Sequence, residues 1–200
     1  MDAPTGKRAI EVPVDSLPPV DEHGVEIAAD PDQVWEALSA TLPRTLNSRR
    51  SARFSKLLGD AFTEARGEPT VIGSTVPGFI VSRSIRPSVL ALLGQHRFSR
   101  YALVFRLDEL GTGRSRLRAE TRAEFPGAKG RVYRALVIGS RAHFLVVRRI
   151  LSAVRRRAEG TRATVARTQI REWVTDYERA WRTDGSGPLS GLFSEDATYS

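Results

Sequence analysis

The residue best suited to chemistry is His143, at the middle of the apolar side of a helix predicted over residues 130–159. Imidazole titrates near neutral pH, so this side chain can hold a polar ligand group or act as general acid or base on a carbonyl or phenol. The alternative is a histidine that hydrogen-bonds a sheet side chain, which is the commoner role of a lone buried histidine. Gly139, about one turn away, leaves room for a ligand or for close approach to a sheet.

Two hydroxyl groups can join this histidine. Tyr101 and Thr121 lie on the apolar faces of predicted strands and can direct their hydroxyls into the same space, although satisfied core hydroxyls are the alternative for both. The apolar residues predicted to line the space are Leu103, Phe105, Leu136 and Val147. No nucleophile triad and no glycine-rich phosphate loop can be assembled, so the sequence leaves open whether the protein is an enzyme.

The sequence gives no indication of a metal or other cofactor. It has no cysteine, which excludes disulfides, a thiolate nucleophile and cysteine-ligated metals. Its three histidines, His23, His96 and His143, are far apart in the sequence. We therefore expect no metal site and no cofactor.

The element that must position His143 is the long helix over residues 130–159. This stretch has no proline and one internal glycine, and arginines recur every seven residues on the side opposite the apolar one: Arg134, Arg141, Arg148 and Arg155. Thirty residues make a helix of about 45 Å. The length predicts that the helix packs on a broad curved sheet.

The preceding sequence predicts that sheet. Asp30 and Pro31 indicate the start of a helix that ends before Pro43, and Gly111-Thr112-Gly113 predicts a hairpin turn. A second helix is predicted over residues 51–58. A short strand is predicted over 24–29, and β-rich composition with glycine or proline breaks predicts strands over 61–65, 73–85, 88–95 and 97–107. Alternating apolar and polar residues predict that 101–107 and 117–125 form an antiparallel hairpin.

This order of elements resembles the helix-grip superfamily called SRPBCC or START-like, which includes the polyketide cyclase/dehydrase-like proteins. The resemblance covers residues 22–159 and includes the opening VEIAADPDQVWEAL, the closing hairpin and the long helix. It implies an α+β fold in which a curved antiparallel sheet wraps the long helix around an apolar cavity for lipids, sterols or polyketides. It implies no particular catalytic residue.

The last forty residues resemble the start of a second kind of domain. A predicted amphipathic helix over residues 164–182 leads into LFSEDATY, which is similar to the opening of SnoaL-like domains of the nuclear transport factor 2-like superfamily. The matching residues are Tyr177, Ala180, Trp181, Leu192, Phe193, Glu195, Asp196, Ala197 and Tyr199. The segment is far shorter than such a domain, so we expect residues 160–200 to be an incomplete one.

The distribution of charge indicates which anionic partners the protein could bind. The net charge is +8, and residues 130–159, with eight arginines and one glutamate, supply seven of these charges. No aromatic residues interleave with the arginines to stack on bases, which argues against nucleic acid. A solvated arginine face is the simplest explanation, and docking to an anionic membrane surface is the alternative.

The sequence thus predicts an N-terminal extended arm over residues 1–21, a helix-grip domain over 22–159 and an incomplete domain over 160–200. The expected function is to bind a small hydrophobic molecule between sheet and helix. A cyclase or dehydrase using His143 is the first alternative, and membrane docking through the arginines is the second. No signal peptide or membrane span is evident, so we expect a cytoplasmic protein. The sequence leaves the oligomeric state open.

Overall fold

The computed structural model describes residues 13–46, 62, 64–96, 99–126 and 142–182 of the chain. It forms two compact units, Met1–Glu159 and Gly160–Ser200. The predicted helix over residues 51–58 lies outside the described residues.

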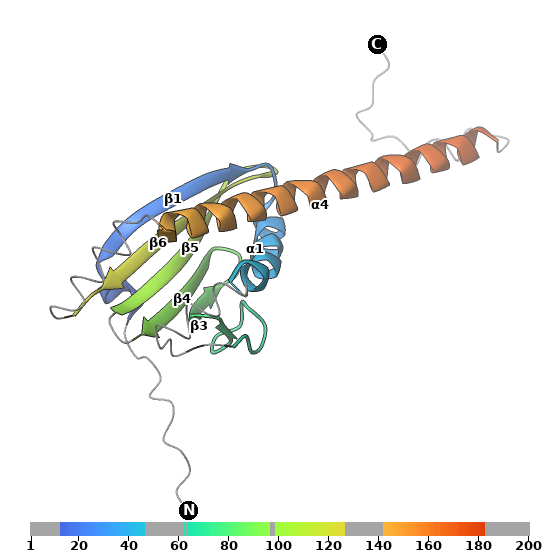
Figure 1. Ribbon diagram of the computed structural model, residues 1–200. Helices are drawn as coiled ribbons and strands as arrows, with labels where there is room; N and C mark the ends of the chain where they lie inside the picture. The colour runs from blue at the N-terminus through green and yellow to red at the C-terminus, as the bar shows by residue number, and fades with distance from the viewer. Residues whose placement is uncertain (1–12, 47–61, 63, 97–98, 127–141, 183–200) are drawn as a thin grey trace, which may run out of the picture. The chain divides into compact units, whose positions relative to one another are not determined.

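The first unit is built on one curved antiparallel sheet (Figure 1). Six strands lie in the order β1-β6-β5-β4-β3-β2, so the N-terminal strand pairs with the last one and the other strands follow as hairpins. The strands are β1 (Pro19–Ile27), β2 (Thr75–Val76), β3 (Phe79–Ile85), β4 (Val89–His96), β5 (Ser99–Gly111) and β6 (Arg114–Glu124). The predicted hairpin between β5 and β6 is confirmed, since Gly111 and Gly113 have the positive φ angles that its turn requires.

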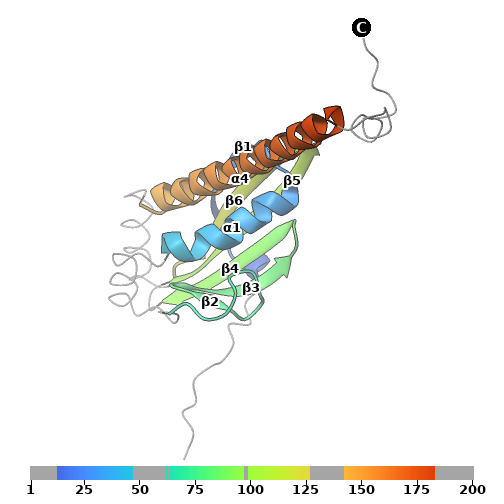
Figure 2. The ribbon, with the colours of Figure 1, turned by 90° about the vertical axis from the view of Figure 1, so that its right-hand side faces the viewer.

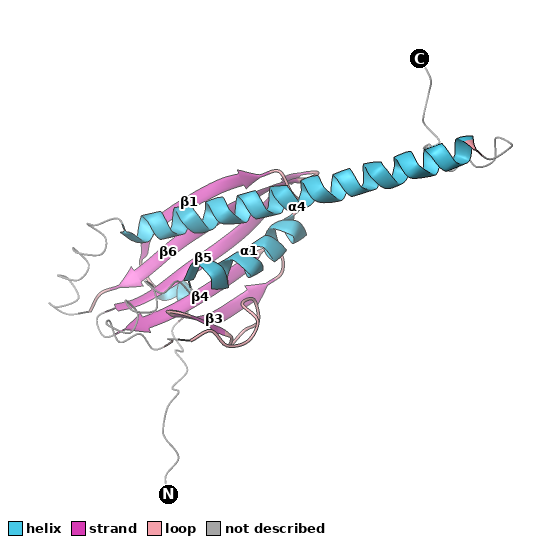
Figure 3. Cartoon of the chain, turned by 45° about the vertical axis from the view of Figure 1, so that its right-hand side comes forward, coloured by secondary structure: helices cyan, strands magenta, loops and turns pink. Residues whose placement is uncertain are grey.

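Two helices cover one face of this sheet, α1 (Pro31–Leu46) and the first part of α4 (Ala142–Trp181) (Figures 2 and 3). Apolar residues of both helices and of the sheet form one core cluster. The buried residues contributed by α4 are Val147, Ile150, Leu151, Val154 and Ala158. The chain therefore has the predicted α+β helix-grip arrangement.

The first helix differs from its predicted end. α1 continues through Pro43 to Leu46, although a proline inside a helix removes one backbone hydrogen bond. Leu42 and Leu46 on either side of Pro43 are buried in the core, and their burial compensates for the lost bond. Asp30 precedes the helix as expected, but its carboxylate accepts a hydrogen bond from the amide of Gly113 at 3.0 Å, so it ties the helix start to the β5–β6 turn.

Two strands also differ from their predicted bounds. β1 begins at Pro19, five residues before the predicted start, and ends at Ile27. The predicted strand over residues 61–65 is not found among its described residues, which are 62, 64 and 65. A single bridge between Arg66 and Thr75 lies beside it instead.

Residues 14–21, which the sequence assigns to an extended arm, are in close contact with the sheet. A short 3-10 helix, η1 (Val14–Ser16), leads to Leu17, which packs on Leu93 and Ala102 on the face opposite the helices. The guanidinium of Arg122 donates hydrogen bonds to the carbonyl oxygens of Asp15 and Leu17. This segment crosses the outer face before the chain turns into β1.

The outer face is otherwise charged, as the alternation of β6 predicts. Even-numbered side chains of β6 form ion pairs with neighbouring strands, for example Arg116 with Glu26 at 2.8 Å and Arg118 with Asp108 at 2.9 Å. The hydrogen bond from Arg116 lowers the pKa of the Glu26 carboxyl, with further help from Arg114. Exposed pairs of this kind contribute little individually, so the packing of the inner face dominates the stability of the sheet.

The long helix does not end at Glu159. α4 is continuous from Ala142 to Trp181 and passes through Gly160, where the sequence predicts a break between two helices. A glycine costs only about 1 kcal/mol in a helix interior, and no proline follows before Pro188. The predicted start of the long helix at residue 130 lies outside the described residues.

Gly94 of β4 is a position where we expect any side chain to be harmful. A Cβ atom there would lie 2.3 Å from the Tyr101 ring and 2.4 Å from the Gly78 carbonyl oxygen. Gly94→Ala should therefore lower the free energy of unfolding by about 1–3 kcal/mol in urea denaturation. Gly24→Ala on β1 is the control, because its Cβ meets nothing closer than 3.4 Å. Equal stability of the two variants would contradict this account.

The packing of α4 on the sheet can be tested in the same way. Ile150 is fully buried in the core cluster, whereas Leu145 on the same helix is 65% exposed. Ile150→Ala should cost about 2–5 kcal/mol of unfolding free energy, and Leu145→Ala should change it by about 0.5 kcal/mol or less. A similar loss in both variants would show that the first part of α4 does not pack as described.

Candidate functional site

The inner face of the sheet changes character along its length. Toward the β5–β6 turn it is apolar and closed, since Ile27, Leu117 and Phe105 are all buried in the core. Toward the beginning of β1 it carries polar groups, and the side chains of Asp21 and His23 remain 22% and 24% exposed. The polar side chains of the inner face that could take part in chemistry therefore lie at the end of the sheet near the start of α4.

His23 and Asp21 form the first part of this polar group. They are two residues apart on β1, so both side chains project from the same face of the strand. His23 Nε2 lies 3.6 Å from a carboxylate oxygen of Asp21 and has no hydrogen-bond partner among the described residues. An imidazole beside a carboxylate can accept, donate or transfer a proton.

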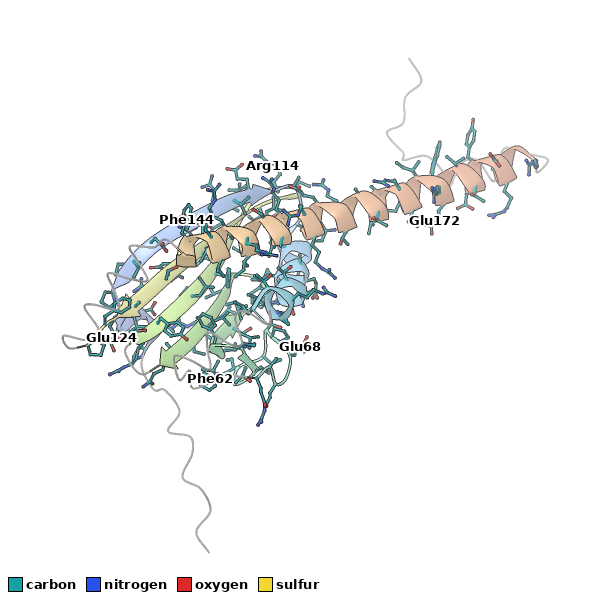
Figure 4. All side chains as sticks on the ribbon, viewed as in Figure 1. Phe62, Glu68, Arg114, Glu124, Phe144 and Glu172 are labelled. Atoms are coloured by element: carbon teal, nitrogen blue, oxygen red, sulfur yellow. The ribbon has the colours of Figure 1, made fainter. Side chains whose placement is uncertain are left out.

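Phe144 lies in the first turn of α4 (Figure 4), and its ring contacts that of His23. The two rings meet edge to face with their centroids 4.7 Å apart. The Arg148 guanidinium lies over the Phe144 ring, 5.2 Å from its centroid, within the range of a cation–π contact. This contact fixes the start of the described part of α4 over β1.

Thr121 supplies the second part of the polar group. It pairs with Asp21 across β1 and β6 and with Leu103 across β6 and β5, on the inner face. Its hydroxyl oxygen is buried and has no hydrogen-bond partner among the described residues. Buried hydroxyls are nearly always hydrogen-bonded in folded proteins, so an unsatisfied one beside a His–Asp pair indicates a place for a polar atom of a ligand or for water.

Tyr101 is oriented by contacts of its own. Its ring packs edge to face on Phe79 with centroids 5.2 Å apart and lies against Gly94. Its hydroxyl donates a hydrogen bond to the Gly78 carbonyl oxygen at 3.0 Å. The hydroxyl proton of Tyr101 is therefore used within the fold.

The remaining predicted site residues lie either in the core or outside the described residues. Leu103, Phe105 and Val147 lie in the core cluster between sheet and helices. His143 is the second residue of α4, next to Phe144, and its side chain is not among those described. Leu136 and Gly139 lie outside the described residues. The structure thus brings Thr121 together with His23 and Asp21, and the role of His143 stays a prediction.

Sequence reasoning missed His23 and Asp21. The signal was present, because His23, Val25 and Ile27 alternate in the sequence and the last two are apolar. A strand predicted to begin at Gly24 left both polar residues outside the sheet. If the predicted strand is extended toward the N-terminus so that the alternation includes residues 21 and 23, both side chains fall on the inner face.

The described part of the chain also bears on metal binding and on membrane insertion. Among the residues described there, no group of three or more histidine, aspartate or glutamate side chains is placed to hold a metal ion. None of the described helices is both long and apolar enough to cross a membrane.

No protein-family model and no curated protein matches the sequence. Solved structures with a similar fold include the Zhui aromatase/cyclase from Streptomyces sp. R1128, at 21% identity and a TM-score of 0.41, covering 70% of this chain and 92% of that one. Norcoclaurine synthase from Thalictrum flavum, in complex with dopamine and hydroxybenzaldehyde, is 15% identical with a TM-score of 0.43, covering 76% and 94%. CalU16 from Micromonospora echinospora is 17% identical with a TM-score of 0.36, covering 72% and 87%.

At these identities the likeness concerns the fold alone. The resemblance of residues 160–200 to SnoaL-like domains stays a prediction.

Proposed function

We propose that the protein binds a small, largely apolar molecule between the inner face of the sheet and the start of α4. The molecule carries a hydroxyl or carbonyl group that is held by Thr121, His23 and Asp21. The observation that supports this most is the buried Thr121 hydroxyl without a hydrogen-bond partner among the described residues. A ligand oxygen at this position would satisfy it.

The apolar side chains around this polar group favour a ligand that is mostly apolar and has one polar end. Phe144 and Val25 border the polar group, and the core residues Leu103 and Phe105 continue the apolar surface along β5. Small-molecule sites in proteins are typically apolar with a few polar groups that fix orientation. An aromatic or polyketide-like compound with one oxygenated end fits this chemistry better than a sugar or a phosphorylated metabolite.

Thr121→Val tests the proposal directly, because it keeps the shape of the side chain and removes the hydroxyl. The variant should be as stable as the parent or slightly more stable, since it removes an unsatisfied buried group. It should bind the ligand about two- to tenfold more weakly. Ligands would first be identified by native mass spectrometry of the full chain with a panel of fatty acids, sterols and aromatic polyketides, and affinities then measured by calorimetry.

Thr75→Val is the matched control. Thr75 is also a buried strand threonine, but its hydroxyl donates to the Glu64 carbonyl oxygen at 2.8 Å and lies on β2, away from the site. This variant should lose stability and keep its ligand affinity. The proposal fails if both variants bind equally, or if no compound of the panel binds the parent.

A cyclase or dehydrase activity on such a ligand is the first alternative. The His23–Asp21 pair supports it, since a carboxylate beside an imidazole can orient that ring for proton transfer. His143 is the other candidate acid or base. An enzyme would lose turnover but keep ligand affinity in His23→Ala or His143→Ala, whereas a pure binding protein would show no turnover in the parent.

Docking to an anionic membrane surface is the second alternative, and the first part of α4 supports it. Leu145 and Val146 are exposed beside a row of exposed arginines, and no acidic residue lies between Ala142 and Ala158. The exposed arginines are Arg148, Arg149, Arg155, Arg156 and Arg157. Apolar side chains next to arginines are typical of helices that lie on lipid headgroups.

This alternative predicts salt-sensitive binding to vesicles. The full chain should sediment with phosphatidylglycerol-containing vesicles at low salt, should be released as salt rises, and should not bind phosphatidylcholine alone. Arg149→Glu should weaken the binding, while Arg44→Glu on α1 should leave it unchanged. Equal binding to both kinds of vesicle would exclude an electrostatic membrane site.

A further inference from the structure

The strand β1 contains one more residue than its partner β6 at the point where the candidate site begins. Pro19 pairs with Arg122 of β6. Asp21 pairs with Thr121, only one residue away on β6, so Val20 is an extra residue of β1. Such an extra residue makes a β-bulge, which bends its strand and turns the side chain beside it in a new direction. The side chain beside this bulge is that of Asp21.

The bulge also connects the two faces of the sheet. Leu17 and Asp21 are four residues apart, and an uninterrupted extended chain would direct both side chains to the same face. Leu17 instead packs on Leu93 and Ala102 on the outer face. Asp21 lies on the inner face, next to His23. The extra residue therefore joins a segment anchored on the outer face to the polar group on the inner face.

Arg122 anchors this outer segment, which we define as residues 13–18. Its Nη1 atom donates hydrogen bonds to the carbonyl oxygens of Asp15 and Leu17, at 3.1 and 3.0 Å. The neighbouring amide of Ala123 donates to the Pro18 carbonyl oxygen at 3.0 Å. The Arg122 side chain is only 18% exposed, so little water competes for these bonds. The outer segment is thus fixed up to the residue before β1.

The direction of Asp21 matters for the polar group. Asp21 and His23 are successive residues on one face of β1, and such residues are about 6.5 Å apart along a regular strand. The Asp21 carboxylate nevertheless lies 3.6 Å from His23 Nε2, so the two side chains lean toward each other. The bulge immediately before Asp21 is the place where this direction is set.

We propose that Arg122 and Val20 are positioning residues of the candidate site. Arg122 anchors the outer segment, and the bulge at Val20 converts this anchor into the direction of the Asp21 carboxylate toward His23. This role rests on the proposed function, because Asp21 and His23 belong to the proposed ligand site.

Deletion of Val20 tests the bulge. Without it Pro19 and Asp21 become neighbours, as their partners on β6 already are, so β1 becomes regular and Leu17 keeps its outer contacts. The imidazole nitrogen and proton signals of His23 in NMR spectra of the full chain should shift. The shift should have the direction seen in Asp21→Asn, because both changes take the carboxylate away from the ring. Unchanged His23 signals would overturn the proposal.

The strand β3 provides the matched control, because it has a bulge of its own. Val81 pairs with Leu92, and Arg83 pairs with Ala91, the adjacent residue of β4. Ser82 is therefore the extra residue of β3, away from the candidate site. Its deletion should leave the His23 signals unchanged. Equal shifts in the two deletion variants would indicate a general response of the sheet and would also overturn the proposal.

Arg122→Met tests the anchor, because it keeps the aliphatic part of the side chain and removes every donor. The His23 signals should shift in the direction seen in Asp21→Asn, although Arg122 lies on the opposite face. Arg122→Lys should restore the parent signals at least in part, since an ammonium group can donate to the same carbonyl oxygens. If Arg122→Met does not fold, Arg122→Gln, which keeps a single amide donor, takes its place.

Arg116→Met is the control for the anchor. Arg116 is also an outer arginine of β6, and it pairs with Glu26 of β1 at 2.8 Å instead of with the outer segment. Its loss should leave the His23 signals unchanged. Equal shifts in Arg116→Met and Arg122→Met, or no restoration by Arg122→Lys, would overturn the role of Arg122.

These spectra distinguish the positioning role from the proposed function, because they are recorded without any added compound. A parent chain that binds no fatty acid, sterol or aromatic polyketide refutes the proposed function, and the His23 signals of the variants still decide the positioning role. Conversely, a parent that binds one of these compounds and shows unchanged His23 signals in the Val20 deletion keeps the function and overturns the positioning role.

Discussion

The apolar contact between the first part of α4 and the inner face of the sheet is the interaction on which the first unit depends. Val147, Ile150 and Val154 recur at helical spacing and belong to one core cluster with alternate residues of β5 and β6. In proteins, most of the stability of a helix comes from packing its apolar face, and the apolar face of a sheet likewise gains stability when it is covered. Each buries the surface that the other exposes, and the position of Phe144 over His23 follows from that contact.

Most of the fold could be predicted because it depends on periodicity. Alternation in β5 and β6, glycines in their turn and helical spacing after residue 142 are properties of neighbouring residues. The errors arose where tertiary contacts override local preference: Leu42 and Leu46 keep α1 helical through Pro43, and pairing with β6 extends β1 back to Pro19. Leu17 was placed in an extended arm for the same reason, since only the folded sheet offers Leu93 and Ala102 as its partners.

The candidate site could be predicted only in part. Thr121 was found from strand alternation, and its unsatisfied hydroxyl is known only from the three-dimensional arrangement. The proposed site also carries an energetic cost, because a buried hydroxyl without a partner destabilises the fold that contains it. A fold tolerates such a cost where function requires the group, and the nearby His23 and Asp21 make that explanation more convincing than a packing error.

The alternation of β6 has a consequence for how this protein can evolve. Even-numbered residues of the strand, such as Glu120 and Arg122, hold it in place through ion pairs and the Leu17 segment, while odd-numbered residues face the helices. Position 121, whose hydroxyl has no partner among the described residues, can therefore change without removing any of those outer contacts, whereas Ala119 and Ala123 are buried. Under the proposed function, a single substitution at this inner position would alter ligand preference and leave the outer ion pairs of the strand unchanged.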